Sequence, residues 1–322
     1  MTATATRTLT TSTTGGSRRD RPPTEPLRPG DMLFRASNAF VFIVFALICA
    51  YPFYYLIINS ISANDLSAAG DVRIWPIDVH LTNYAQVFQL PGLPLAAVVS
   101  IGRTVIGTVL TVLASAFLGF MFTQSRMWGR QFWYRFLIIT MYFSAGLIPI
   151  FIVMKTLGLT NNFWVYVLPF VVQPFNVILA KTYVESMPRE LQEAAEMDGA
   201  NILQVFFRVY LPNMVPILAT IAIFSAVTQW NSFQDTLIYV TDQSLYTLQF
   251  LLYMFINQAS SLAIAAQNSG GNLAQIAGLA GEQTPTSIRM TVSVLVILPI
   301  IFVYPLFQRF FVKGIMLGAV KG

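Results

Sequence analysis

Long apolar stretches separated by short charged segments form the main pattern along the chain. Charged residues are absent between residues 35 and 65, 103 and 126, 135 and 155, 155 and 181, 208 and 235, and 289 and 309. A helix needs about 20 apolar residues to cross a bilayer, and in lipid its backbone must satisfy its own hydrogen bonds. The pattern therefore predicts an all-α membrane protein with six transmembrane helices, at about residues 39–58, 104–122, 136–154, 163–180, 212–233 and 290–307.

Composition supports a membrane protein. Of the 322 residues, 55% are hydrophobic and only 10% are charged, with a mean hydropathy of +0.63, whereas charged residues make up about 25% of soluble domains. The single cysteine, Cys49, falls in the first predicted span, and the single histidine, His80, falls in a loop. These counts exclude a disulfide framework within the chain and give no metal or catalytic cluster.

The distribution of Lys and Arg predicts the orientation, because cytoplasmic loops are enriched in both. With the N-terminus inside, the cytoplasmic segments contain basic residues within 7–35, 126–135, 181–208 and 309–321. The outer segments contain Arg73, Lys155 and Arg289. Both termini are therefore predicted in the cytoplasm, and the pI of about 9.4 reflects this topology rather than nucleic-acid binding.

Two segments differ from the transmembrane pattern. Residues 1–30 are rich in Thr, Ser, Gly, Pro and Arg, which predicts a disordered cytosolic tail before a transmembrane domain at 31–322. An outer region at about 234–288 is nearly uncharged, and its second half, 258–286, is dense in Ser, Gly, Asn, Gln and Ala. That half is predicted to be a long loop, which either contacts a partner or is passive and mobile.

The cytoplasmic loop at 184–212 contains signals for two short helices. Pro188 suits a first helical turn, and Gly199 can adopt the left-handed conformation that ends a helix. Asn201 and Gln204 have the spacing of a capping box, which predicts a second helix after the turn. Pro212 is predicted to end this pattern and to open the next span.

The first of these helices carries small and acidic side chains, which suit close docking against a basic partner. Glu193-Ala194-Ala195, then Gly199, Val209 and Leu211-Pro212 at fixed spacing match the EAA motif of permeases of binding-protein-dependent ABC importers. From about residue 34 onward the chain resembles the smaller permease of maltose-type sugar importers and the oligosaccharide permeases of Gram-positive bacteria. A solvated surface helix is the alternative explanation, but it gives no reason for this spacing.

The resemblance implies a type I ABC importer permease fold in a bacterial cell membrane. It also implies a second permease subunit, a dimer of ATP-binding subunits and an extracellular solute-binding protein, which residues 258–286 would contact. The residues expected to couple to the ATPase are Glu193, Ala194, Ala195, Asp198, Gly199, Leu211 and Pro212. The C-terminal residues expected to reach the ATPase interface are Lys313, Gly314, Gly318 and Lys321.

The chain contains no Gly-Lys dipeptide, so it lacks the phosphate-binding P-loop that ends in Gly-Lys-Ser/Thr. ATP and Mg²⁺ are therefore expected in a partner subunit, and this chain is expected to be non-catalytic and without a cofactor. The predicted spans contain no charged residue, which weighs against a proton-driven transporter, because such transporters use intramembrane charges. An uncharged pathway favours an uncharged solute such as a carbohydrate.

Polar and aromatic residues within the spans are candidates for the substrate pathway, because sugars offer both hydroxyl groups and apolar faces. These candidates are Gln173, Asn176, Gln229, Trp230 and Asn231. Interhelical hydrogen bonding or interfacial anchoring is the simpler explanation for any single one of them.

Two other functions compete with an ABC permease. A stand-alone secondary transporter of a small polar solute predicts intramembrane charges or an internal repeat, and the sequence pattern shows neither. A membrane scaffold or assembly factor leaves the EAA motif unexplained.

Overall fold

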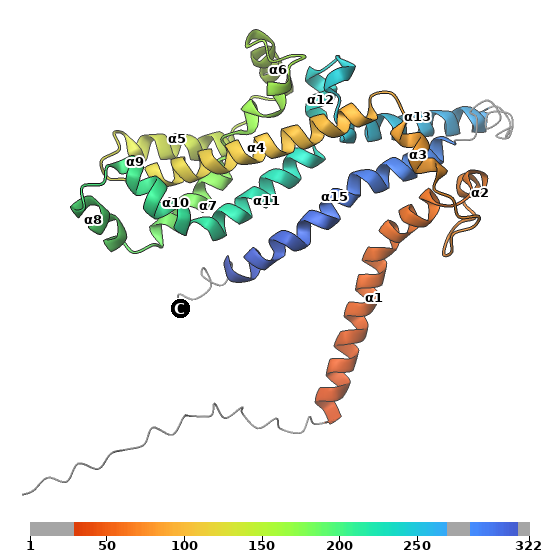
Figure 1. Cartoon of the computed structure of the whole chain (residues 1–322), viewed down its shortest axis with the longest axis horizontal. Coiled ribbons are helices and arrows are strands. Elements are labelled where there is room, and N and C mark those ends of the chain that lie inside the picture. Colours follow the sequence, from red (N-terminus) through yellow and green to blue (C-terminus); the bar gives the residue numbers. More distant parts are fainter. Residues whose placement is uncertain (1–28, 269–283, 315–322) are drawn as a thin grey trace, which may run out of the picture. The chain divides into compact units, whose positions relative to one another are not determined.

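The computed structural model describes residues 29–268 and 284–314, and within them every regular element is a helix (Figure 1). The chain divides into two compact units, Met1–Tyr51 and Pro52–Gly322. Helix α1 (Pro29–Ser60) continues from the first unit into the second. The predicted tail lies outside the described residues except for its last two positions, which begin α1.

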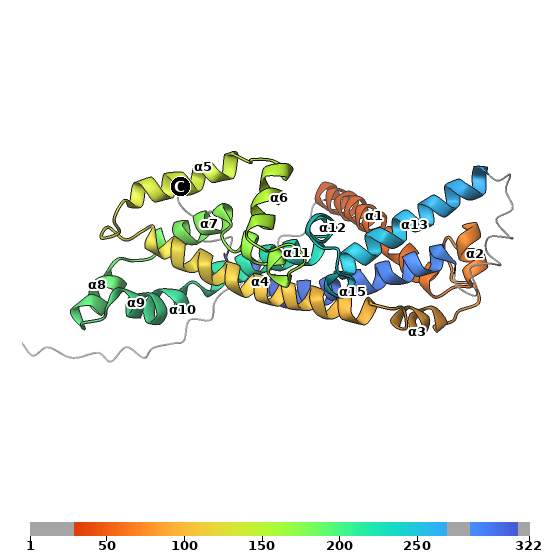
Figure 2. The same ribbon diagram turned by 90° about the horizontal axis from the view of Figure 1, so that it is seen from above.

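Helix α4 (Leu93–Met121) is the central element of the second unit (Figures 1 and 2). It packs against α7 (Pro174–Glu185) and α11 (Val215–Asn231). Helix α15 (Pro285–Gly314) packs against α11 and against α13 (Leu248–Asn268). Part of the predicted 258–286 loop is therefore helical, since α13 extends to Asn268, and residues 269–283 lie outside the described part of the chain.

Shorter helices complete the unit. The loop between α1 and α4 contains α3 (Thr82–Phe88). The others outside the 184–212 loop are α2 (Asn64–Ala69), α5 (Arg130–Tyr142), α6 (Leu147–Thr156), η1 (Phe163–Tyr166), η2 (Leu168–Phe170), α12 (Gln234–Tyr239) and η4 (Gln243–Leu245).

The described helices provide two to four candidate membrane spans. Two helices are long and apolar enough on their own, namely Met32–Ser60 within α1 and the whole of α4. Two bent pairs add one span each if each pair is a single crossing: η1–η2 with α7, bent by 45°, and Ile202–Asn213 with α11, bent by 79°. The all-helical prediction is confirmed, whereas six continuous spans are not found among the described residues.

Glycine and proline explain why the apolar segments are interrupted. The predicted span 136–154 is divided between α5 and α6, and Gly146 before α6 has a φ of +85°, which glycine adopts without strain. The predicted span 163–180 is divided before Pro174, the first residue of α7, where a missing N–H costs no helical hydrogen bond. Hydropathy records the apolar character of these segments but not their breaks.

Small residues let α4 approach its neighbours closely. A Cβ atom added at Gly119 would lie 2.7 Å from the Cβ of Ala180 and 2.8 Å from the backbone nitrogen of Lys181. Helices in membranes associate largely through such close packing, because lipid provides little hydrophobic driving force between them. Gly119 therefore fixes the spacing between α4 and α7.

We expect Gly119→Ala to destabilise the folded protein by about 1–3 kcal/mol, because the added methyl group must displace backbone. Thermal unfolding of the purified protein in detergent measures this effect. Gly102→Ala on the same helix is the matched control, since its Cβ would lie 3.7 Å from the Phe163 ring, an ordinary contact. Equal unfolding temperatures for the two variants would contradict the close-packing explanation.

Candidate functional site

The loop between α7 and α11 folds into the two predicted short helices and a further, wider one. Helix α8 (Glu190–Met197) comes first, and α9 (Ile202–Val205) follows the turn. A π-helix, η3 (Phe206–Tyr210), and the short α10 (Leu211–Asn213) then lead to α11. Pro212 lies in α10 rather than at the start of the span, because the chain bends between α10 and α11.

The turn between α8 and α9 has the predicted chemistry. Gly199 has a φ of +81°, and the backbone N–H of Ala200 donates to the carbonyl of Ala195 at 3.0 Å. The Asn201 side chain accepts from the backbone N–H of Gln204 at 2.9 Å, and the Gln204 side chain accepts from the Asn201 N–H at 2.8 Å. The capping box and the left-handed turn are both confirmed.

Helix α8 has an attached face and an exposed face. Gln192 and Ala195 are half-buried, and Ala195 packs against the main apolar cluster of this region. Glu193 and Ala194 are exposed, and Met197 is 88% exposed. The two alanines of the motif therefore have different surroundings, since Ala195 anchors the helix and Ala194 leaves a shallow surface beside an acid. Asp198 and Gly199 are exposed at the end of the same helix.

Hydrogen bonds tie the attached face of α8 to the segment that directly follows α4. The Gln192 side chain donates to Oε1 of Gln124 at 2.9 Å, and Gln124, which is buried, donates back to Gln192 at 3.3 Å. The hydroxyl of Tyr210 donates to the same Gln192 oxygen at 3.3 Å. Glu196 forms a partly exposed ion pair with Arg126 at 3.3 Å. Helix α8 is thus held to the segment that follows α4.

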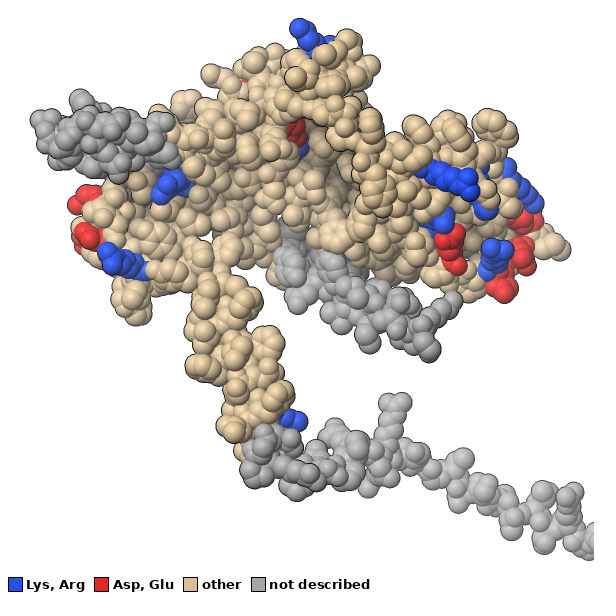
Figure 3. Space-filling view, turned by 180° about the vertical axis from the view of Figure 1, so that it is seen from behind, with Lys and Arg blue, Asp and Glu red and all other residues tan. Residues whose placement is uncertain are grey.

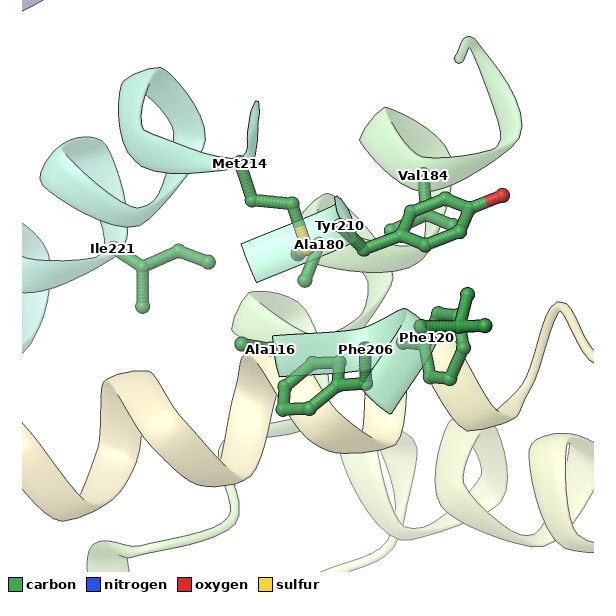
Figure 4. Packing of buried hydrophobic residues seen from close by; sticks show 9 residues of the cluster. Ala116, Phe120, Ala180, Val184, Phe206, Tyr210, Met214 and Ile221 are labelled. Carbon is green, nitrogen blue, oxygen red and sulfur yellow. The ribbon is translucent and has the colours of Figure 1, made fainter. Parts of the chain in front are cut away.

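An apolar cluster supports the loop from inside (Figure 4). Its buried side chains come from α4, α7, the 202–214 segment and α11, and they are Ala116, Phe120, Ala180, Val184, Val205, Phe206, Tyr210, Met214 and Ile221. The Phe120 ring lies 5.3 Å from Phe206 and 4.9 Å from Tyr210, centroid to centroid. Leu211 is packed against this cluster from outside. Movement of the loop is therefore coupled by packing to three other helices.

Charged side chains of both signs gather at the end of the second unit that carries α8 (Figure 3). The acidic residues belong to α8, which has Glu190 and Glu193 in its first turn. Basic residues follow α4, and Arg126 is paired there with Glu196. This end presents a polar surface with an exposed acidic helix, which is the expected chemistry of a docking site for a basic partner.

The predicted C-terminal contacts are only partly within the described chain. Lys313 and Gly314 form the end of α15. Gly318 and Lys321 lie outside the described residues, so their role stays a prediction.

The predicted pathway residues on α7 are close to the helix start. Gln173 precedes α7, is half-buried, and donates to the carbonyl of Phe170 at 3.4 Å. Asn176 is buried in the first turn of α7. Among residues 29–268 and 284–314, no group of three His, Cys, Asp or Glu side chains is arranged to hold a metal ion.

The predicted pathway residues on α11 have three different environments. Gln229 is buried and accepts hydrogen bonds from Arg103 at 3.0 and 3.2 Å. Trp230 is also buried, and its indole N–H donates to the carbonyl of Val296 at 3.0 Å. Asn231 is exposed and accepts from the Gln249 side chain at 3.2 Å. Asn231 alone of these three presents an amide at the surface of the described chain.

The structure also reveals a buried charge that the apolar pattern missed. The second predicted span begins at residue 104, but α4 begins eleven residues earlier, so Arg103 lies inside the helix and forms a buried ion pair with Asp235. Both residues served only as the ends of apolar gaps in the sequence. Their separation of 132 residues gives no local signal of pairing. The position of Arg103 directly before an apolar stretch was the one signal for including it in the helix.

Residues 112–317 match the family model described as "Binding-protein-dependent transport system inner membrane component", a range that includes the whole α8–α10 loop. The polygalacturonan/rhamnogalacturonan transport system permease protein YtcP of Bacillus subtilis is 32% identical over 280 residues, covering 87% of this chain and 95% of that protein. Protein LplC of the same organism is 34% identical over 271 residues, covering 84% of this chain and 89% of that protein.

A solved structure shares the fold. It is the crystal structure of a bacterial ABC transporter involved in the import of the acidic polysaccharide alginate, and the matching chain has a TM-score of 0.79 at 30% sequence identity. The match covers 89% of this chain and 100% of that one. With most of the chain matched by relatives and by the family model, this chain belongs to the family of binding-protein-dependent transport system inner membrane components.

Proposed function

We propose that this permease imports an oligosaccharide across a bacterial cell membrane, driven by ATP hydrolysis in a separate subunit that docks on α8. The observation that carries the proposal is the two-faced docking helix. Its exposed face presents Glu193 and Ala194, and its attached face is tied through Gln192 to the end of α4. A force applied to the exposed face therefore reaches α4, the central apolar helix of the second unit.

The proposed assembly follows from the separation of transport and ATP hydrolysis between different subunits. Because the chain lacks Gly-Lys, ATP and Mg²⁺ belong to the partner ATPase dimer. A second permease completes the membrane domain, and an extracellular solute-binding protein delivers the substrate. Both termini lie in the cytoplasm in this arrangement, and residues 313–322 contact the ATPase dimer as an additional attachment.

The names of the relatives support a carbohydrate as the substrate. YtcP is named for polygalacturonan and rhamnogalacturonan transport, and AraQ of Halalkalibacterium halodurans, 29% identical over 288 residues, for arabinooligosaccharides. Asn231 and Gln249 form an exposed amide pair, and the stacked rings of Phe233 and Tyr253 lie 4.7 Å apart nearby in the sequence. Amides and aromatic faces are the groups that bind sugar hydroxyls and sugar C–H faces.

A stand-alone secondary transporter is the second candidate, and the buried Arg103–Asp235 pair is the observation that favours it, since such transporters use intramembrane charges. The pair is nevertheless closed: the carboxylate and the guanidinium neutralise each other and are both nearly inaccessible to solvent. An ion or proton carrier needs a group that exchanges with water. Family membership and the closed pair together favour the ABC permease.

Charge reversal on the exposed face of α8 tests the docking proposal. We expect Glu193→Lys to weaken ATPase association by roughly a hundredfold, because like charges at an interface cost several kcal/mol. Co-purification and titration of the ATP-binding subunit measure the affinity. Glu185→Lys, at an exposed residue that ends α7, is the control for a reversed cytosolic charge. Unchanged association and uptake in Glu193→Lys would remove α8 as the docking site.

The turn after α8 allows a second test through the backbone. Gly199→Val places a β-branched residue at a φ of +81°, which costs about 1–2 kcal/mol for a left-handed conformation. We expect reduced uptake and weaker ATPase association with normal membrane insertion. Gly199→Asn is the matched control, since Asn tolerates this conformation. No atom lies within 4 Å of the added Cβ, so a difference between the variants reports the backbone rather than a clash.

Uptake assays test the substrate. We expect cells with the complete transporter to take up an oligosaccharide, and Asn231→Ala to raise the KM by about fivefold or more, since a lost hydrogen bond is worth about 1 kcal/mol. Neutral arabinooligosaccharides and acidic oligogalacturonates serve as the two substrate arms. Asn38→Ala, at an exposed position of α1, is the control. Uptake of neither arm, with an intact complex, would contradict a carbohydrate substrate.

A further inference from the structure

Arg103 is a fully satisfied buried cation inside an apolar helix. Its side chain is 1% exposed, and it lies ten residues after the first residue of α4, about 15 Å along the axis. It donates from Nε and Nη2 to Oε1 of Gln229 at 3.2 and 3.0 Å, and from Nη1 to the Ser232 carbonyl at 3.3 Å. Nη1 also donates to Oδ1 of Asp235 at 3.1 Å, and Nη2 donates to its Oδ2. These five bonds equal the five N–H donors of a guanidinium.

The surroundings of the pair keep both charges in place. The carboxylate of Asp235 also accepts from the backbone N–H of Thr236 at 2.9 Å. The guanidinium carbon lies 4.5 Å from the centroid of the Tyr166 ring, a cation–π contact. Separating Arg103 from Asp235 would leave an uncompensated charge in a low-dielectric interior. The pair is therefore expected to stay closed while the protein moves.

The hydrogen-bond partners of Arg103 all lie at or beside one break in the chain. Helix α11 ends at Asn231 and α12 begins at Gln234, so the carbonyl of Ser232 lies between helices and needs an outside donor. Arg103 supplies it. One turn earlier on α4, the Ser100 hydroxyl accepts from the backbone N–H of Leu248 at 2.8 Å, at the start of α13. The outer part of α4 is thus bonded to both segments that flank the Asn231–Gln249 amide pair.

At the other end of α4, the segment that directly follows the helix is bonded to α8 through Gln124 and Gln192. We propose that Arg103 is a positioning residue of transport: its ion pair with Asp235 makes the outer part of α4 and the α11–α12 break move as one body. Displacement of α8 is then delivered along α4 to the segment that presents Asn231. This inference rests on the proposed docking of an ATPase at α8, and its test separates the two ideas.

A structural role alone predicts a different behaviour from a positioning role. Buried ion pairs are often replaced by apolar residues of similar volume without loss of stability. The double variant Arg103→Met with Asp235→Leu therefore removes the connection while leaving a packed interior. The single variant Arg103→Lys keeps the positive charge but loses the planar guanidinium group. The single variant Asp235→Asn keeps the shape of the side chain but loses its negative charge.

The first measurement is uptake per ATP hydrolysed by the assembled transporter in vesicles. We expect the double variant to assemble and to unfold near the parent temperature, with uptake per ATP reduced about two- to thirtyfold, the range of coupling changes seen for such residues. Glu185→Ala, which removes an exposed ion pair with Lys181, is the control and is expected to match the parent. An unchanged ratio in a stably assembled double variant overturns the proposal. If the double variant does not assemble, uptake per ATP is measured in Asp235→Asn instead. A reduced value supports the proposal and an unchanged value overturns it.

The second measurement tests movement as one body. Spin labels are attached to cysteines introduced at two exposed positions, Ile101 of α4 and Leu237 of α12. The background variant Cys49→Ser removes the single native cysteine. We expect the same label distance in the resting transporter and in one trapped with ATP and vanadate. A distance that shifts between these states overturns the proposal. Failure of ATPase docking would instead appear as unchanged association in Glu193→Lys, with the 101–237 distance still constant.

Discussion

The close approach of α4 to its neighbours is the constraint on which the second unit depends. Gly119 brings α4 against Ala180 of α7, and the Gln229 side chain of α11 lies so near Gly107 that a Cβ there would be 2.7 Å from its amide nitrogen. Helices at this spacing gain dispersion contacts and transmit displacement, because a close-packed interior has little free volume. The same helix therefore supports the docking loop at one end and the α11–α12 break at the other.

Sequence reasoning succeeded where the signal is local. The capping box of Asn201 and Gln204 and the left-handed Gly199 depend on residues a few positions apart, so they were predictable in detail. Apolar stretches likewise located the helical segments. The breaks at Gly146 and before Pro174 were not predicted, because hydropathy averages over a window and a single backbone angle does not change the average.

The candidate site shows the same limit more sharply. The residues proposed to dock were predicted from their spacing, but the opposite surroundings of Ala194 and Ala195 depend on how α8 packs against the 202–214 segment. The Arg103–Asp235 pair joins residues 132 positions apart, and only the fold brings them together. Gln229 was predicted as a pathway residue from its amide, and the structure gives that amide to Arg103.

The π-helix Phe206–Tyr210 determines which way the docking helix faces. A wide turn holds one residue more than an α-helical turn, so every residue before it is rotated by about 100° relative to an unbroken helix. The fixed number of residues between Gly199 and Pro212 therefore determines the orientation of α8 more than its distance from α11. A deletion of one residue there would shorten the loop by very little, yet it would point Glu193 to a different side of the molecule.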